Sequence, residues 1–93
     1  MNKRDLETAG QEYARDWFCW NEKALEACPT VELKRRYIQI NAHFESCASD
    51  MGAYDDKGNA RSWSDRDMAA DYIFNGMDKA TKQYLKIHKG VSK

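Results

Sequence analysis

Apolar residues recur at steps of three and four along most of the chain, and this spacing constrains the fold more than any other feature of the sequence. Residues three and four positions apart share one face of an α-helix, whereas a half-buried strand needs alternation at every second position. A single proline and five glycines leave long stretches free of helix-breaking residues. The spacing therefore predicts an all-α fold, and the 93 residues fit one domain spanning 1–93.

The first predicted helix covers about residues 5–27. Its main apolar face consists of Leu6, Ala9, Tyr13, Trp17, Trp20, Ala24 and Cys28. A second stripe lies beside that face and consists of Ala14, Phe18 and Leu25. We expect Gly10 to weaken the early turns, because glycine costs about 1 kcal/mol in a helix interior. Pro29 ends the helix, since proline disfavours the helical conformation of the residue before it.

The second predicted helix covers about residues 31–54. Thr30 is its expected N-cap, and Glu32 in the first turn favours the helix dipole. Its apolar positions form one heptad seam made of Leu33, Tyr37, Ile40, Phe44, Cys47, Met51 and Tyr54. The acidic segment after the helix contains Lys57-Gly58-Asn59, which is typical of a turn with a glycine at positive φ.

The third predicted helix covers about residues 65–89. Ser64 is the expected N-cap with Asp67 at N3, and Trp63 and Met68 occupy the positions of a hydrophobic staple. The seam consists of Ile73, Met77, Ala80, Tyr84, Ile87 and Val91. Gly76, next to this seam, allows a second helix to approach closely. Lys86 lies in the expected last turn, and Gly90 suits the position after it.

Three helices joined by short connections predict an up-down-up antiparallel three-helix bundle. This path gathers residues 22–36 and 78–93 at one end, where nine basic and four acidic residues give a net charge of +5. The other residues carry −5, so a formal net charge of zero conceals two opposed poles. Part of this polarity follows from the preference of cations for helix C-termini.

The basic pole is a candidate surface for phosphates or acidic protein. Its predicted contact residues are Lys34, Arg35, Arg36, Lys82, Lys86 and Lys89. Lys34-Arg35-Arg36 departs from the dipole rule, because that rule disfavours cations at a helix start. Nucleic-acid binding through this pole is therefore the alternative hypothesis, and its affinity would fall steeply with salt.

Four apolar residues lie off the main seams, namely Phe18, Ile38, Phe74 and Leu85. Three helices around one core do not readily bury several stripes each. We therefore expect these side chains to form a partner-binding or self-association surface, unless the core wraps more widely around the helices.

The sequence signals for catalysis and for metal binding are weak. His43 and Cys47 share a helix face, but Cys47 stands within the apolar seam, where cysteine usually behaves as a small apolar residue. Cys19, Cys28, His43 and Cys47 are zinc-type ligands without any paired motif such as C-x-x-C. The sequence therefore predicts no catalytic residue, no metal and no cofactor, and a protein that is not an enzyme.

The opening residues 1–5 show no apolar run, so we expect no secretory signal and no membrane span. The odd cysteine count favours reduced thiols and a cytoplasmic location. The leading hypothesis is a small helical protein-binding adaptor or inhibitor. Compact helical chains of this kind are common among phage and mobile-element proteins, which suggests a protein directed at host nucleic-acid or defence machinery.

Overall fold

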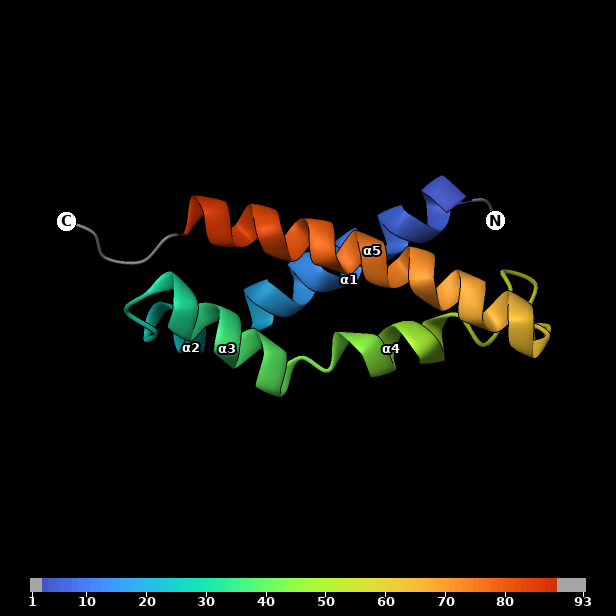
Figure 1. The fold of residues 1–93 in the computed structure, drawn as a ribbon, viewed down its shortest axis with the longest axis horizontal. Coiled ribbons are helices and arrows are strands. Elements are labelled where there is room, and N and C mark those ends of the chain that lie inside the picture. Colours follow the sequence, from blue (N-terminus) through green and yellow to red (C-terminus); the bar gives the residue numbers. More distant parts are fainter. Residues whose placement is uncertain (1–2, 89–93) are drawn as a thin grey trace.

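A computed structural model describes residues 3–88, and this part of the chain is all-helical, as the sequence predicts. The helices are α1 (Lys3–Trp20), α2 (Glu22–Glu26), α3 (Val31–Asn41), α4 (Phe44–Met51) and α5 (Trp63–Ile87) (Figure 1). The molecule is elongated and measures 49 × 21 × 19 Å. The predicted three-helix bundle is not confirmed, because residues 3–88 form five helices: the first two predicted helices are each broken in two.

Helices α1 and α5 make the most extensive helix–helix contact, although they come from opposite ends of the described chain. Gly10 of α1 lies against the backbone carbonyl of Ile73, and Gly76 of α5 lies against that of Glu7. A methyl group at either glycine would overlap the facing backbone, so both glycines permit the close approach. The prediction for Gly76 is confirmed, and Gly10 has the same role.

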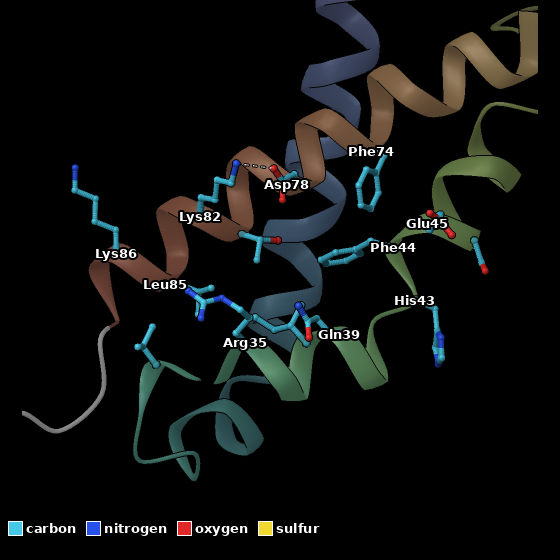
Figure 2. Close-up of a pocket in the computed structure, with 14 residues that line it drawn as sticks. Arg35, Gln39, His43, Phe44, Glu45, Phe74, Asp78, Lys82, Leu85 and Lys86 are labelled. Atoms are coloured by element: carbon cyan, nitrogen blue, oxygen red, sulfur yellow. Dashed lines mark ion pairs between the residues drawn. The ribbon is translucent and has the colours of Figure 1, made fainter. Parts of the chain in front are cut away.

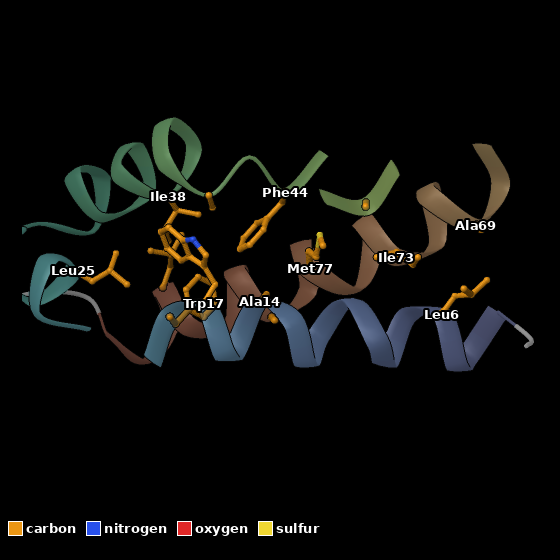
Figure 3. Close-up of a cluster of buried hydrophobic side chains, with 14 residues drawn as sticks. Leu6, Ala14, Trp17, Leu25, Ile38, Phe44, Ala69, Ile73 and Met77 are labelled. Atoms are coloured by element: carbon orange, nitrogen blue, oxygen red, sulfur yellow. The ribbon is translucent and has the colours of Figure 1, made fainter. Parts of the chain in front are cut away.

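The core follows the α1–α5 pair and continues beneath α3 and α4 (Figure 3). Its buried apolar residues are Leu6, Ala14, Trp17, Phe18, Leu25, Ile38, Ala42, Phe44, Ala48, Ala69, Ile73, Met77, Ala80 and Leu85. Both predicted stripes of the first helix contribute to this set. The core therefore wraps more widely than a single seam on each helix.

Phe44, the first residue of α4, lies at the centre of an aromatic cluster. Its ring centroid is 5.8 Å from that of Trp17, 6.1 Å from Phe18 and 6.3 Å from Tyr13, each in an edge-to-face arrangement. Such pairs contribute about 0.5–1.5 kcal/mol each beyond the area they bury. The cluster joins α4 to α1 through side chains.

The break between α1 and α2 falls at Asn21. Its side-chain amide donates to the carbonyl of Trp17 at 2.9 Å, and its backbone N–H reaches the same carbonyl at 3.0 Å. Asparagine side chains that bond nearby backbone compete with continued helix. The predicted helix over 5–27 is therefore interrupted one residue after Trp20.

Lys34 closes the turn that follows α2. Its side-chain ammonium donates to the carbonyl of Leu25 at 2.7 Å and to that of Cys28 at 2.8 Å. Only 5% of its surface is exposed. The lysine therefore satisfies carbonyls left open at a helix end, as lysines near helix C-termini can do.

The break between α3 and α4 falls at Ala42 and His43. His43 adopts the left-handed conformation, with φ 52° and ψ 45°, which costs a non-glycine residue roughly 1–2 kcal/mol. Asn41 repeats the pattern seen at the first break, because its amide donates to the carbonyl of Tyr37 at 2.9 Å. The reversal at His43 directs Phe44 into the aromatic cluster.

This second break also overturns the predicted heptad seam. Ile40 is 60% exposed, and Leu33 and Tyr54 are exposed as well. Helix α3 instead buries Ile38 and Lys34. A seam that is continuous in sequence no longer follows one face once a left-handed residue redirects the chain. Thr30 is confirmed as the N-cap, because its hydroxyl accepts from the backbone N–H of Leu33 at 3.1 Å.

The segment between α4 and α5 is an ordered turn. A carboxylate oxygen of Asp55 accepts from the backbone N–H groups of Lys57 and Asn59 at 2.9 and 2.8 Å. Gly58 has a positive φ of 85°, so the turn predicted at residues 57–59 is confirmed. Arg66 then ties α5 to α4, since its guanidinium donates to the carbonyl of Ser49 at 3.2 Å.

Helix α5 begins at Trp63, two residues before the expected start. Its N-cap is Ser62, whose hydroxyl accepts from the backbone N–H of Asp65 at 3.3 Å, and the prediction of Ser64 is wrong. Ser62 has the extended backbone that an N-cap requires, whereas Ser64 lies within the helix. Trp63 and Met68 are both exposed, which does not fit the predicted staple.

The predicted seam of the last helix is confirmed for Ile73, Met77 and Ala80, which are buried. Ile87 is exposed, and Val91, Gly90 and the expected end at residue 89 lie outside the described residues. Within residues 3–88, no helix combines the length and apolarity needed to cross a membrane.

Candidate partner-binding groove

A groove of about 900 Å³ separates α3 and the start of α4 from the second half of α5 (Figure 2). It exists because α3 makes few close backbone contacts with α5, whereas α1 and α4 pack against α5 extensively. The groove is partly open to solvent, and its surface is mostly apolar.

The floor of the groove is formed by apolar side chains from three helices. Ile38 of α3, Phe44 of α4 and Leu85 of α5 are buried in the core and present their remaining surface to the groove. Phe74 of α5 is 38% exposed, and Figure 2 shows its ring projecting from α5 toward that of Phe44. Val31 adds a further apolar group. These side chains could contact apolar groups of a bound molecule.

Charged residues line the rims. Arg35 projects from α3, and Lys82 and Lys86 project from α5. The ammonium of Lys82 lies 3.0 Å from a carboxylate oxygen of Asp78, one helical turn earlier. Glu45 stands toward the opposite end (Figure 2). The groove thus combines an apolar floor with a basic end.

Most of the residues predicted to contact a partner come together here. Ile38, Phe74, Leu85, Arg35, Lys82 and Lys86 all line this one groove. The structure corrects the expectation that the off-seam apolar residues are exposed, because Phe18, Ile38 and Leu85 are buried. The core wraps around α1 and α5 widely enough to include the second stripes.

The other predicted contact residues lie elsewhere. Lys34 is withdrawn from the surface by its hydrogen bonds to two carbonyls. Phe18 lines a different hollow, and Arg36 faces a polar recess beside the start of α3. Lys89 lies outside the described residues. The predicted basic patch is therefore smaller than the sequence indicated.

Some lining residues were missed by sequence reasoning, notably Gln39, Thr81 and Val31. On α3 the lining positions are 31, 35, 38 and 39, and on α5 they are 74, 78, 81, 82, 85 and 86. Both sets follow the helical three-and-four spacing. A search for mixed polar and apolar stripes at that spacing would have found them.

The second hollow, of about 410 Å³, lies between the end of α1, α2 and the end of α5. The Tyr84 ring stacks between Phe18, at 4.5 Å, and His88, at 4.4 Å. Burial raises the pKa of the Tyr84 phenol above its ordinary value of 10.0, with smaller contributions from Glu26, Cys28 and Glu22.

The cysteines do not gather. Cys19 is exposed, and the Sγ atom of Cys47 lies 3.2 Å from the hydroxyl oxygen of Tyr13. This hydrogen bond, together with burial, raises the pKa of the Tyr13 phenol. Among residues 3–88, no group of three or more His, Cys, Asp or Glu side chains is placed to hold a metal ion. The absence of enzyme activity stays a prediction.

The elements that carry the predicted basic pole lie close together in the structure. Helix α2, the first turn of α3 and the last turn of α5 gather at one end of the molecule (Figure 1). Residues 22–36 and 78–88 carry seven basic and four acidic residues, a net charge of +3 for the described part of this pole. The basic rim of the groove belongs to it.

Comparison with protein-family models, with curated proteins and with solved structures finds no match for this chain.

Proposed function

We propose that the chain is a small protein-binding module, acting as an adaptor or an inhibitor, that holds part of another protein in the groove between α3 and α5. The observation that carries this proposal is the open, mostly apolar groove with charged rims. An apolar recess in so small a domain lacks an obvious role in stability, whereas recesses of this kind are typical of interaction sites.

The shape of the groove favours a macromolecule over a small ligand. Small-molecule sites usually enclose most of the ligand surface. This groove is partly open to solvent, so a small ligand would keep part of its surface in water. A protein segment would cover Phe74 and the exposed part of the floor, and the rest of the partner would shield the open side.

Nucleic-acid binding, the alternative from sequence, has fewer groups to draw on. Lys34 is buried, and Lys82 is paired with Asp78. Within residues 3–88, Arg35, Arg36 and Lys86 remain as exposed cations of the predicted patch that form no ion pair. Each phosphate contact needs its own cation, so this described part of the patch would support only weak, salt-sensitive binding.

The proposal is tested by affinity purification with tagged protein from a bacterial lysate, with and without nuclease. We expect a stoichiometric protein partner that resists nuclease and is lost with Phe74→Glu, which places a carboxylate in the groove. The matched control is Trp63→Glu, an equally polar change at an exposed ring outside the groove. It should retain the partner.

Three outcomes would overturn the proposal: recovery of no stoichiometric protein, loss of the bound material on nuclease treatment, or equal effects of the two variants. Circular dichroism of both variants establishes that they remain folded. Self-association stays a separate prediction from the sequence, and sedimentation equilibrium of the purified chain tests it. The phage or mobile-element setting remains a hypothesis based on size and type.

A further inference from the structure

We infer that the segment bound in the groove is an amphipathic helix of two to three turns that carries acidic side chains at its flanks. This inference rests on the proposed function and names the chemistry of the partner. It follows from the length, the shape and the charge of the groove.

The length is set by the lining residues of α5. They extend from Phe74 to Lys86, twelve steps along the helix, which corresponds to about 18 Å. The lining residues of α3 run alongside in the opposite chain direction, from Val31 to Gln39 (Figure 1). The two helices therefore form the walls of a trough as long as roughly twelve residues of helix.

The volume sets a shorter occupied length than the walls. A helix about 10 Å across occupies on the order of 900 Å³ over a length of about 12 Å, or roughly eight residues. The groove volume of about 900 Å³ therefore corresponds to about two turns of helix, fewer than the twelve residues that the walls could flank. A helix seated there would pack against α3 and α5 together, as an added helix does in a bundle. Its apolar face would meet Ile38, Leu85 and Phe74.

An extended strand is a poorer occupant. Strand addition needs a sheet edge with unpaired backbone groups. The described residues contain a single isolated bridge, between Tyr54 and Ala60, and it does not line the groove. The walls are mostly helix interior, where backbone groups are paired within each helix, and only the first turn of α4, which has no side-chain cap, leaves N–H groups open. Side-chain packing must therefore supply most of the affinity.

The charges on the rim select acidic flanks. Arg35 and Lys86 form no ion pair or hydrogen bond within residues 3–88, whereas Lys82 is engaged by Asp78. Glu45 is the acidic lining residue that also lacks such a partner there. The two unpaired cations lie toward the end of the groove formed by the last turns of α5. Carboxylates on the bound helix would pair with them.

The experiment uses two stapled 14-residue peptides with leucines at positions i, i+3 and i+7. One peptide carries glutamates at its flanking positions and the other carries lysines at the same positions. The staple holds both peptides helical, so the cost of helix formation does not obscure the comparison. Amide shifts of the ¹⁵N-labelled full chain locate the contact, and fluorescence anisotropy gives the affinities.

We expect the acidic peptide to bind at least about fivefold more tightly than the basic peptide, since two rim pairs contribute modestly. The shifts should centre on Ile38, Phe74 and Leu85. The double variant Arg35→Glu, Lys86→Glu should reverse the preference. The matched control is Arg36→Glu, a neighbouring residue of α3 that does not line the groove, and it should leave the preference unchanged.

Tighter or equal binding of the basic peptide, or shifts centred outside the groove, would overturn the inference. If neither peptide perturbs the groove at millimolar concentration while Phe74→Glu still abolishes capture of a protein, the groove holds a protein element other than an acidic helix. If Phe74→Glu also leaves the capture of a protein partner unchanged, the proposed function itself fails. Tight binding of duplex DNA abolished by the double variant would favour a nucleic acid as the occupant.

Discussion

Gly10 and Gly76 occupy reciprocal positions where α1 meets α5, each against a backbone carbonyl of the other helix. The contact joins the two ends of the described chain and brings Ile73 and Met77 into the fully buried part of the core. The groove depends on it indirectly, because α1 occupies one face of α5 and leaves another to be shared by α3 and α4.

Gly76→Ala should lower the free energy of unfolding by about 1–3 kcal/mol, the usual range for overpacking. The added methyl group would overlap the carbonyl of Glu7, so the two helices must separate. Helix propensity by itself would make alanine more stable than glycine by about 1 kcal/mol. A lower free energy of unfolding for the variant would therefore show that the steric overlap outweighs helix propensity. Urea unfolding followed by circular dichroism measures the loss.

The control for this substitution is Asn75→Ala, one residue away on the exposed face of α5. It should stabilise the protein by a few tenths of a kcal/mol through helix propensity. Stabilisation by Gly76→Ala of the same size as the control would mean that α1 and α5 do not approach as described.

Lys34→Met should lower the free energy of unfolding by about 2–4 kcal/mol. The substitution keeps the apolar stem and removes two charge-assisted hydrogen bonds, to the carbonyls of Leu25 and Cys28. Arg36→Met, at an exposed position two residues along α3, should change stability by less than about 0.5 kcal/mol. Thermal and urea unfolding of both variants provide the test, and equal stabilities would count against the capping role.

His43 provides a test of the break between α3 and α4. His43→Gly should be neutral or stabilising by up to about 1 kcal/mol, since glycine adopts the left-handed conformation without strain. His43→Val should lose at least about 1 kcal/mol, because a β-branched residue is a poor fit at positive φ. A valine variant as stable as the glycine variant would indicate one continuous helix. Differential scanning calorimetry distinguishes the two results.

We expect the protein to lose stability at alkaline pH, when the phenol of Tyr84 ionises. Burial raises the pKa of its phenol, so the folded state favours the neutral form. The corresponding stabilisation is complete below the unfolded value of about 10 and is lost as pH rises through the folded pKa. Tyr84→Phe keeps the ring but cannot ionise, and it should lose less stability than the wild type as pH rises above about 10.

The control for the pH series is Tyr54→Phe, at an exposed ring, and its stability should follow the wild-type curve. Urea midpoints measured at intervals of half a pH unit provide the comparison. Superposition of all three curves would show that Tyr84 does not contribute to the alkaline transition.

The all-α class, the N-cap at Thr30, the turn at residues 57–59 and the close approach at Gly76 were predicted from sequence. Each depends on local chemistry: residue spacing, a hydroxyl at a helix start, or the conformational freedom of glycine. The asparagines at the two breaks were available as signals, because Asn21 and Asn41 each bond a carbonyl four residues back.

The burial of individual side chains was less predictable. The seam through Leu33 and Ile40 has the spacing of a core, yet both residues are exposed. Ile38 lies off that seam and is buried. The left-handed turn at His43 separates the faces of α3 and α4, and its strain is offset by the packing of Phe44 among distant rings.

The sequence by itself determined that this protein is helical, where several helices begin, and which residue types could meet a partner. The tertiary structure decided where the helices break, that Lys34 is a cap and not a surface cation, and that Ile38, Phe74 and Arg35 line one groove. The reason is that local propensity depends on near neighbours, whereas the breaks and the groove depend on contacts between α1, α3 and α5 that are remote in sequence.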